Sequence, residues 1–307
     1  MDEQWILARR REALQTRAEM IQTIRQFFLS RDYLEVETPL RVPTQAPEAH
    51  IDPVMSEGWF LHTSPELCMK RLLAAGYERI FQFARCFRAG ERGNLHIGEF
   101  TLLEWYRAGI DYGDMMDECE ELFIHIAEAL DRGQTVTYQG HTIALERPWE
   151  RIAVREAFRR HAPLTMEAAI EAGSFDETMV SHIEPRIGRT GPTILYDYPA
   201  SLAALSRIRE DDPGVAERFE IYLGGLEVAN AFSELTDANE QRARFAREQD
   251  HRRTMGKPPY PEPERFLAAL PSMPQSSGIA LGVDRLAMIF TDSDTIDDVV
   301  AFTPEML

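Results

Sequence analysis

Residues 87–107 read FRAGERGNLHIGEFTLLEWYR and carry the most informative pattern in the chain. Arg88 closes one strand-like run, IFQFARCFR (80–88), and Glu99 opens a second, EFTLLEWYRA (99–108). Between the runs lie glycines and further charged or titratable side chains, namely Glu91, Arg92 and His96. Aromatic and β-branched runs around a polar, glycine-containing segment predict two strands joined by a loop. Hairpin tips are usually shorter and less charged, so the charged residues of this loop indicate a functional role.

The second of these strands has an unusual face. Because side chains alternate along a strand, four of them point to the same side: Phe100, Leu102, Glu104 and Tyr106. A glutamate and a tyrosine among apolar neighbours are uncommon in a packed core strand. The alternation therefore predicts that this face lines a pocket.

A capped helix is predicted directly before the first strand, over SPELCMKRLLAAGYER (64–79). Ser64 is a suitable N-cap, Pro65 fits the first helical position, and Glu66 lies in the positive first turn. Gly76 is a suitable terminator. The segment thus predicts a helix that presents an acid at its N-terminus.

The other regular elements are predicted from spacing alone. Apolar residues within 7–31 recur at helical intervals and predict a long helix, followed by a short strand over 34–39 that ends at Pro39. An ordinary helix–strand unit would give the same pattern. Residues 114–131 read as an amphipathic helix, and residues 135–185 mix short strands and helices without recognisable chemistry.

A second hairpin is predicted over FEIYLGGLEVANAFSEL (219–235). Gly224-Gly225 suits a two-residue turn, which pairs 223 with 226, 222 with 227 and 220 with 229. Glu220 and Glu227 then lie on one face as diagonal neighbours, within ~7–8 Å at the backbone. Two carboxylates this close repel unless a cation lies between them. The pair is therefore either a Mg²⁺ site or part of a solvated hairpin with exposed acids.

Whether Glu234 shares this pocket depends on the path of the second strand. Counting along the strand gives Glu234 the opposite parity to Glu220, so their side chains would point to opposite faces. We therefore expect a bend near residues 230–232 if Glu234 is to reach the pocket.

The segment SSGIALGVDRLAMIF (276–290) predicts a strand of small residues followed by a helix. Gly282 allows close approach to the backbone, and Arg285 falls in the first helical turn. A cation is disfavoured there by the helix dipole. Arg285 therefore indicates an anionic partner, which is either a phosphate or a nearby Asp or Glu.

The composition is that of a globular protein, with 307 residues, 44% hydrophobic and 27% charged. No apolar run approaches the ~18 residues of a transmembrane helix, and the N-terminus lacks the apolar core of a signal peptide. Cys68, Cys86 and Cys119 fit neither a disulfide framework nor a zinc site, which favours free thiols in a reducing cytoplasm. A net charge of −18 opposes a broad non-specific grip on nucleic acid. No repeat or Gly/Ser linker divides residues 1–307, so we expect a single domain.

Taken in order, these segments resemble the three signature motifs of class II aminoacyl-tRNA synthetases. Residues 20–40, 80–108 and 276–290 resemble motifs 1, 2 and 3. The similarity is to the lysine-specific branch in particular, through TSPELCMKRLLAAG, EFTLLEWYRA, FEIYLGGLEVANAFSELTDANEQRARF and GVDRL. It runs over nearly the whole chain and is weakest across 130–190. The resemblance implies an α+β fold, with a mainly antiparallel sheet flanked by helices, and it implies ATP and Mg²⁺ as cofactors.

A synthetase of this branch carries an N-terminal anticodon-binding β-barrel of about a hundred residues, whereas here only about twenty residues precede motif 1. The chain is therefore more similar to the free-standing paralogues, ligases that activate (R)-β-lysine or lysine as an adenylate. These ligases transfer it to the ε-amine of a lysine on translation elongation factor P. The resemblance implies a homodimer with elongation factor P as partner, and neither tRNA nor a membrane. Two rivals stay open: a truncated enzyme that charges tRNA or a small-molecule acceptor, and an inactive regulatory paralogue.

The resemblance also implies roles at the nucleotide. Arg88 would bind the α-phosphate and Arg285 the γ-phosphate, both as catalytic residues, and Phe100 would stack on adenine. Family members have Asn-Glu directly after this arginine. Here the pair is Ala89-Gly90, and the acid is expected one position later. Further contacts are expected from Glu91, His96, Glu227, Val228 and Gly282. Glu220 and Glu227 would hold Mg²⁺.

For the amino acid, the resemblance implies that Glu66 takes the backbone amine. Glu234 and Tyr106 would grip the ε-ammonium, and Glu104 would support the pocket. Ser64, Asn230 and Ala280 would complete it. Ala280 lies where lysyl-tRNA synthetases have glycine, and the added methyl would reshape the pocket in a way consistent with a β-amino acid.

Overall fold

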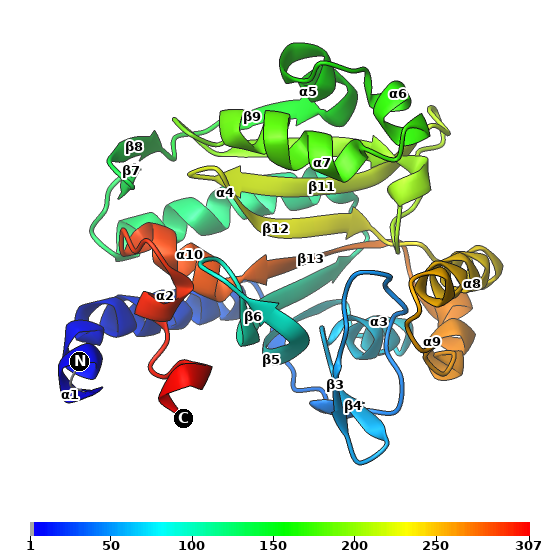
Figure 1. The fold of residues 1–307 in the computed structure, drawn as a ribbon, viewed down its shortest axis with the longest axis horizontal. Coiled ribbons are helices and arrows are strands. Elements are labelled where there is room, and N and C mark those ends of the chain that lie inside the picture. The colour runs from blue at the N-terminus through cyan, green and yellow to red at the C-terminus, as the bar shows by residue number, and fades with distance from the viewer. Residues whose placement is uncertain (1–2) are drawn as a thin grey trace.

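Eight strands pair into one sheet in the computed structural model, which describes residues 3–307 (Figure 1). The strands, in spatial order, are β1 (Leu34–Glu35), β5 (Arg79–Arg92), β6 (Ile97–Ala108), β13 (Ser276–Gly282), β12 (Leu226–Ser233), β11 (Val215–Leu223), β10 (Thr193–Pro199) and β9 (Glu150–Ala153). The two edge pairs, β1–β5 and β9–β10, are parallel, and the five pairs between them are antiparallel. The prediction of a mainly antiparallel sheet in an α+β fold is confirmed.

Three helices cover one face of this sheet: α2 (Arg11–Leu29), α4 (Tyr112–Ala129) and α10 (Val283–Phe290). Their apolar stripes pack on inward-facing residues of the central strands, and this layer forms the largest core. Phe27, Phe28 and Trp105 are all fully buried within it. The predicted long N-terminal helix is two helices, because α1 (Glu3–Arg9) and α2 are separated at Arg10.

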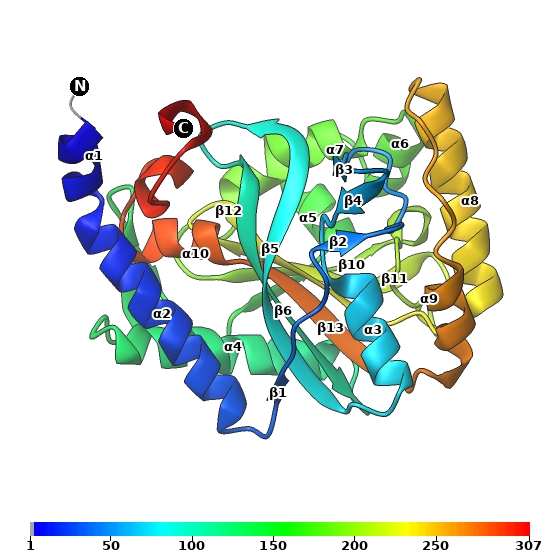
Figure 2. The same ribbon diagram turned by 90° about the horizontal axis from the view of Figure 1, so that it is seen from below.

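The opposite face of the eight-stranded sheet carries other helices and a second, small sheet. Helix α3 (Glu66–Ala74) and a small sheet of β2 (Arg41–Val42), β4 (Trp59–Leu61) and β3 (Val54–Ser56) lie there. Helix α9 (Glu264–Ala269) packs against α3, and α8 (Ala238–Thr254) packs against α9. Figure 2 shows these elements on the far side of the sheet from α2 and α4. The sheet is therefore covered tightly on one face and only in part on the other.

The remaining elements lie around this frame. The strands are β7 (Thr135–Tyr138) and β8 (His141–Ala144), and the helices are α5 (Val154–His161), α6 (Met166–Glu171), α7 (Phe175–Thr178), η1 (Met179–Ile183), η2 (Glu184–Arg186), η3 (Ala200–Leu202), η4 (Leu270–Ser272), η5 (Ile296–Val299) and η6 (Pro304–Met306). Within residues 3–307, no helix has the length and hydropathy needed to cross a membrane.

The hairpin of β5 and β6 is longer than predicted. Its strands continue past residues 88 and 99 until Arg92 pairs with Ile97, although residues 88–91 have no register partner on β6. The register shifts between Phe87 and Arg92, and Gly90 takes a positive φ of 78° there. The charged segment is therefore mostly an irregular strand extension, because a glycine absorbs the backbone distortion.

The turn of the second hairpin is as predicted, but its register is not. Gly224 and Gly225 both have positive φ, as a type I′ turn requires. Residue 223 pairs with 226 and 222 with 227, but Glu220 pairs with Asn230 in place of residue 229. A β-bulge beyond residue 227 inserts one residue and reverses the parity of the rest of β12. This bulge replaces the bend expected near residues 230–232.

The capped helix also begins later than predicted. Helix α3 starts at Glu66 and not at Pro65, although the Ser64 hydroxyl still accepts a hydrogen bond from the Glu66 N–H at 3.0 Å. Gly76 follows the helix with φ of 93° and ends it as expected. The N-terminus of α3 thereby points its first-turn acid at the open face of the sheet.

Candidate active site

A cavity of about 470 Å³ lies between the open face of the sheet and the elements that cover it. It is lined by every residue predicted to contact a ligand: Ser64, Glu66, Arg88, Glu91, His96, Phe100, Glu104, Tyr106, Glu220, Glu227, Val228, Asn230, Glu234, Ala280, Gly282 and Arg285. These residues come from the two hairpins, from α3 and from the strand–helix unit β13–α10. The fold thus gathers the whole predicted set around one space.

A buried cluster of charged side chains occupies one part of this cavity. The Lys70 ammonium, one helical turn after Glu66, lies 2.5 Å from Glu66 Oε1 and 2.5 Å from Glu234 Oε2. The side chains of Lys70 and Glu234 are each only 1% exposed. Burial by itself lowers the pKa of Lys70, but Glu234 and Glu66 together raise it above its usual value, so the ammonium stays charged. Sequence analysis missed Lys70, although its i,i+4 spacing from Glu66 marks a pair.

Glu234 has one oxygen left over. The bulge in β12 turns Glu234 toward the cavity, where Oε1 is buried and has no hydrogen-bond partner among residues 3–307. Burial raises the pKa of Glu234 to about 7, although the charge of Lys70 acts to lower it. A buried carboxylate oxygen without a partner costs free energy, so it is suited to receive a cation from a ligand.

Glu104 is held differently from Glu234. Its Oε1 accepts a hydrogen bond from the Ser64 hydroxyl at 2.6 Å, and its Oε2 accepts one from the Tyr106 hydroxyl at 2.9 Å. Burial, and then the charge of Glu66, raise the pKa of Glu104 to about 8. Glu104 therefore fixes Ser64 and Tyr106 in place, and its charge depends on what binds beside it.

Small residues on β13 make room for this cluster. Gly278 pairs with Tyr106 on one side and Phe232 on the other. A β-carbon at Gly278 would overlap the Tyr106 ring and lie 2.5 Å from Glu234 Oε1. Two positions further along, Ala280 pairs with Glu104 and Asn230, and its methyl faces the cavity. The depth of the cavity is therefore set by the smallest side chains of β13.

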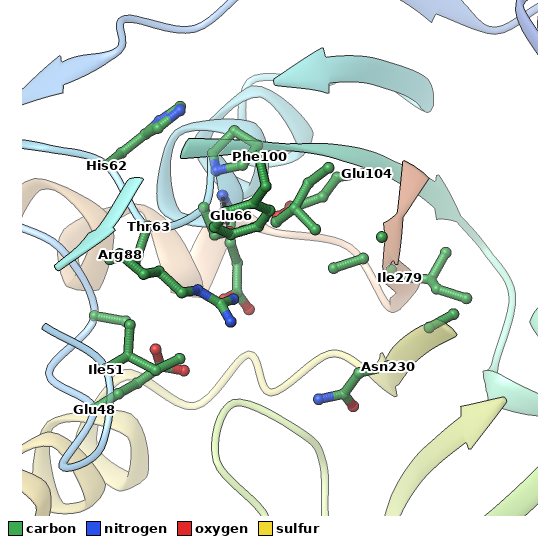
Figure 3. Close-up of a pocket in the computed structure, with 18 of the residues that line it drawn as sticks. Glu48, Ile51, His62, Thr63, Glu66, Arg88, Phe100, Glu104, Asn230 and Ile279 are labelled. Carbon is green, nitrogen blue, oxygen red and sulfur yellow. Dashed lines mark hydrogen bonds between the residues drawn. The ribbon is translucent and has the colours of Figure 1, made fainter. Parts of the chain in front are cut away.

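Arg88 brings positive charge into the middle of the cavity. Figure 3 shows its side chain reaching inward, with Glu48 and Ile51 on one side and Glu66 and Phe100 on the other. Its guanidinium carbon lies 4.9 Å from the centre of the Phe100 ring, and its nearest acid is Glu91, at 3.7 Å. Arg88 is thus a partly free cation beside an aromatic face, which suits a phosphate next to a planar base.

Arg285 provides a second cation from the first turn of α10. It donates to the backbone oxygen of Glu227 at 2.8 Å and lies 3.6 Å from the Glu227 carboxylate. It also lies 2.5 Å from His96 Nε2. Burial, and then Arg285, lower the pKa of His96, so a neutral imidazole accepts from the guanidinium. Arg285 therefore has the Glu227 carboxylate at its side, and it also faces the cavity, where a phosphate has room to bind.

Glu220 and Glu227 lie close together but have different surroundings. Glu220 is saturated, because Oε1 contacts Arg218 at 2.6 Å and Oε2 accepts from Tyr198 and Tyr222. Burial, and then Glu220, raise the pKa of Glu227 to about 7. Their mutual repulsion and nearby Asn230 Oδ1, which is buried without a partner among residues 3–307, suit a hard cation. The part of the chain that the structure describes has no group of three His, Cys, Asp or Glu that could hold a metal, so a ligand must supply further donors.

Glu48 is a further acid that sequence analysis missed. It lies in an irregular segment that is anchored by Arg252 of α8, a residue only 1% exposed. Arg252 donates to the backbone oxygens of Glu48 and Ile51 and pairs with Asp52 at 3.0 Å. Lys257 pairs with Asp52 at 2.8 Å. Burial raises the pKa of Glu48 to about 7. No periodic pattern marks this segment, so only the folded chain reveals that it lines the cavity.

Comparison with known proteins gives one family. The family model described as tRNA synthetases class II (D, K and N) matches residues 4–306. The chain is 41% identical over 303 residues to the elongation factor P–(R)-β-lysine ligase of Proteus mirabilis, with 93% of each chain covered. It is 40% identical to the ligase of the same name from Hamiltonella defensa, with 94% of each chain covered. The Vibrio vulnificus ligase of that name is also 40% identical, with 95% of each chain covered.

Proposed function

Since this chain belongs to the class II tRNA synthetases of the D, K and N group, we propose the following activity. The protein is an ATP-dependent ligase that activates (R)-β-lysine or lysine as an adenylate and transfers it to a lysine ε-amine of translation elongation factor P. The names of relatives that share nearly its full length support the acceptor and the amino acid. The cavity independently supports the substrate class.

The observation that carries the substrate class is the free Oε1 of Glu234. It is buried in the cavity wall, next to Gly278 and the edge of the Tyr106 ring, and the charge of Glu66 acts on it. An aspartate or asparagine side chain would bring a carboxylate or an amide oxygen against these acids, at a high cost. A side chain that ends in an ammonium satisfies the free oxygen and lowers the free energy of the cluster.

In the first step, a carboxylate oxygen of the amino acid attacks the α-phosphorus of ATP and pyrophosphate leaves. Little proton transfer is needed, so rate enhancement comes from positioning and charge stabilisation. We assign Arg88 to the α-phosphate and Arg285, with His96, to the terminal phosphates. Phe100 offers its ring to adenine, and Glu91, Val228 and Gly282 line the nucleotide end.

In the second step, the deprotonated ε-amine of the acceptor lysine attacks the carbonyl carbon of the mixed anhydride. The carbon–oxygen bond to phosphate breaks, AMP leaves with both electrons of that bond, and the new amide nitrogen loses one proton to solvent. Glu66 holds the amine of the activated amino acid, while Glu234 and Tyr106 hold its ε-ammonium. Ser64, Glu104, Asn230 and Ala280 shape the pocket around the chain between these groups.

The acids at the nucleotide end fit Mg²⁺. We propose Glu227 as its main protein ligand, with Glu220 behind it, because Glu220 already has a partner on each oxygen. Bound Mg²⁺ would offset negative charge on the phosphates. Arg218 pairs with Glu220 at 2.6 Å, so that carboxylate already has a cation beside it.

We also propose that residues 1–307 act as one catalytic domain and that two copies pair through the segment that resembles motif 1. Around the end of α2 and β1, three leucines are unusually exposed: Leu29 at 51%, Leu34 at 51% and Leu40 at 45%. An exposed apolar group of this kind is typical of an interface. Sedimentation of the purified protein should give twice the 35.1 kDa of one chain, and a monomer at micromolar concentration would contradict the proposal.

The activation step is tested by amino-acid-dependent ATP–pyrophosphate exchange. We expect exchange with lysine and with (R)-β-lysine, and none with aspartate or asparagine. Exchange driven by aspartate or by asparagine would contradict the assigned pocket. An absence of exchange with all four, together with calorimetric binding of Mg²⁺–ATP, would favour the inactive regulatory rival.

A further inference from the structure

The substrate pocket already contains an ammonium group of its own. Lys70 touches both carboxylates that the proposed function gives to the two amines of the substrate, Glu66 and Glu234, at 2.5 Å each. It is fully buried in α3, so it is not a surface residue that happens to reach inward. A resident cation in a pocket for a cationic ligand would normally compete with that ligand. Its geometry explains why it does not.

Lys70 takes only one oxygen of Glu234. The ammonium contacts Oε2, whereas Oε1 stays without a partner on the cavity side, against the backbone of Gly278. The incoming ε-ammonium therefore has its own acceptor and need not displace Lys70. On Glu66 the ammonium likewise contacts a single oxygen, Oε1.

The charges that act most strongly on Lys70 are those of acids. Glu66 comes from its own helix, Glu234 follows β12, and Glu104 and Tyr106 come from β6. The ring of Phe232 lies 5.8 Å from Nζ, and the guanidinium carbon of Arg218 lies 5.9 Å from the centre of the same ring. Without Lys70, burial and the charge of Glu66 would both favour protonated Glu234. A protonated Glu234 offers the substrate a neutral carboxyl in place of a counter-ion.

We propose that Lys70 is a positioning residue for the amino acid: it favours the ionised form of Glu234 and fixes the spacing between Glu66 and Glu234, so that the empty pocket is arranged for an amino acid with two amines. The inference rests on the proposed function and concerns a residue that makes no contact with ATP. It places the selection of diamino acids in a charge triad, Glu66–Lys70–Glu234, and not in Glu234 alone.

The test uses Lys70→Met, which keeps the chain length of the side chain but removes its charge, in ATP–pyrophosphate exchange with lysine. We expect the KM for lysine at neutral pH to rise by roughly 10- to 100-fold, as for loss of one charge-assisted contact. The KM for ATP and the kcat at saturating lysine should stay within about twofold. Raising the pH toward 9 should lower the KM of the variant toward the wild-type value, by about tenfold per pH unit. The reason is that Glu234 then ionises without the charge of Lys70.

A double variant separates positioning from general damage. In a Glu234→Gln background, Lys70→Met should raise the KM for lysine by much less than it does alone, because the carboxylate whose ionised form it favours is gone. If Lys70→Met does not fold, Lys70→Gln carries the same test, since its amide can still donate to both carboxylates but adds no charge.

Two results would overturn the inference. One is a wild-type KM for lysine in either Lys70 variant at neutral pH. The other is an equal loss for lysine and ATP that no increase in pH repairs, which is the signature of a merely structural role. An absence of lysine-dependent exchange in the wild-type protein would instead contradict the proposed function, so the two failures are distinguishable.

Discussion

The ring of Tyr106 lies directly against the backbone of Gly278, on the strand next to its own. A β-carbon at Gly278 would occupy the space of that ring and would also lie 2.5 Å from Glu234 Oε1. This contact links the fold to the site. The close pairing of β6 and β13 lets the Glu234 carboxylate and the Tyr106 ring approach each other over Gly278. The glycine acts here through its lack of a side chain, since its φ lies outside the left-handed region.

Gly278→Ala should therefore disable the lysine end of the cavity and spare the nucleotide end. We expect the KM for lysine in pyrophosphate exchange to rise at least about 30-fold, because Tyr106 and Glu234 must both move. The affinity for ATP should change little. Gly214→Ala is a matched control, since that exposed glycine would meet only the flexible side chain of Asp212 at 3.1 Å and the distant Arg155. Unchanged lysine kinetics in Gly278→Ala would contradict the pocket assignment.

Glu234→Gln should separate amino acid recognition from nucleotide binding. The amide keeps the shape of the side chain but removes the counter-ion for the ε-ammonium, a loss of about 2–3 kcal/mol or roughly 30- to 150-fold in kcat/KM for lysine. Calorimetric titration with Mg²⁺–ATP should give a wild-type Kd. Equal losses for lysine and ATP would place Glu234 with the nucleotide and not with the amino acid.

The two acids assigned to the Mg²⁺ region should respond differently to removal of their charge. Glu227→Gln should raise the Mg²⁺ concentration needed for half-maximal exchange by at least about tenfold, because a neutral amide is a weaker ligand for a hard cation. Glu220→Gln should chiefly lower stability, because it leaves the partly buried Arg218 without its counter-ion, at a cost of up to about 3–5 kcal/mol. Chemical denaturation and a Mg²⁺ titration of both variants provide the measurement. A larger Mg²⁺ effect in Glu220→Gln would reverse the two roles.

Glu104 should make the empty enzyme less stable as the pH rises. Its pKa is raised from 4.5 to about 8 in the folded chain. The folded state therefore holds the proton more tightly than the unfolded state throughout that window. The free energy of unfolding should fall with increasing pH by at most about 1.4 kcal/mol per unit from this group.

The matched variant for this effect is Glu104→Gln, which cannot titrate. Urea unfolding of ligand-free wild type and variant near pH 5.5 and pH 7.5 should show that the wild type loses more stability between these values, by about 1–2 kcal/mol. Identical pH dependence in the two proteins would show that Glu104 does not titrate in this window.

Periodicity predicted much of the fold and of the site. The alternation in β6 places Glu104 and Tyr106 on the cavity side, and the Gly224-Gly225 turn gives the initial register of β11 and β12. Local patterns failed where one extra residue changes the geometry. A β-bulge leaves no signature in side-chain alternation, so the route by which Glu234 enters the cavity was wrongly predicted as a bend.

The missed residues share a physical reason. Lys70 and Glu48 derive their importance from partners distant in sequence, Glu234 and Arg252, and a long-range ion pair or a braced loop cannot be seen in a local window. The motif resemblance supplied the identities of the site residues, and the structure adds that they share one cavity. Their individual roles stay predictions that the variants above address.

The most direct test of the central claim is transfer to the acceptor protein. The purified protein is incubated with ATP, Mg²⁺ and elongation factor P, with lysine and (R)-β-lysine in parallel, and the intact mass of the factor is measured. Omitting ATP and replacing the acceptor lysine of the factor are the two controls. We predict that the factor gains the mass of one lysyl group, that both controls abolish the gain, and that tRNA(Lys) is not charged. Efficient charging of tRNA(Lys) with an unmodified factor would contradict the account.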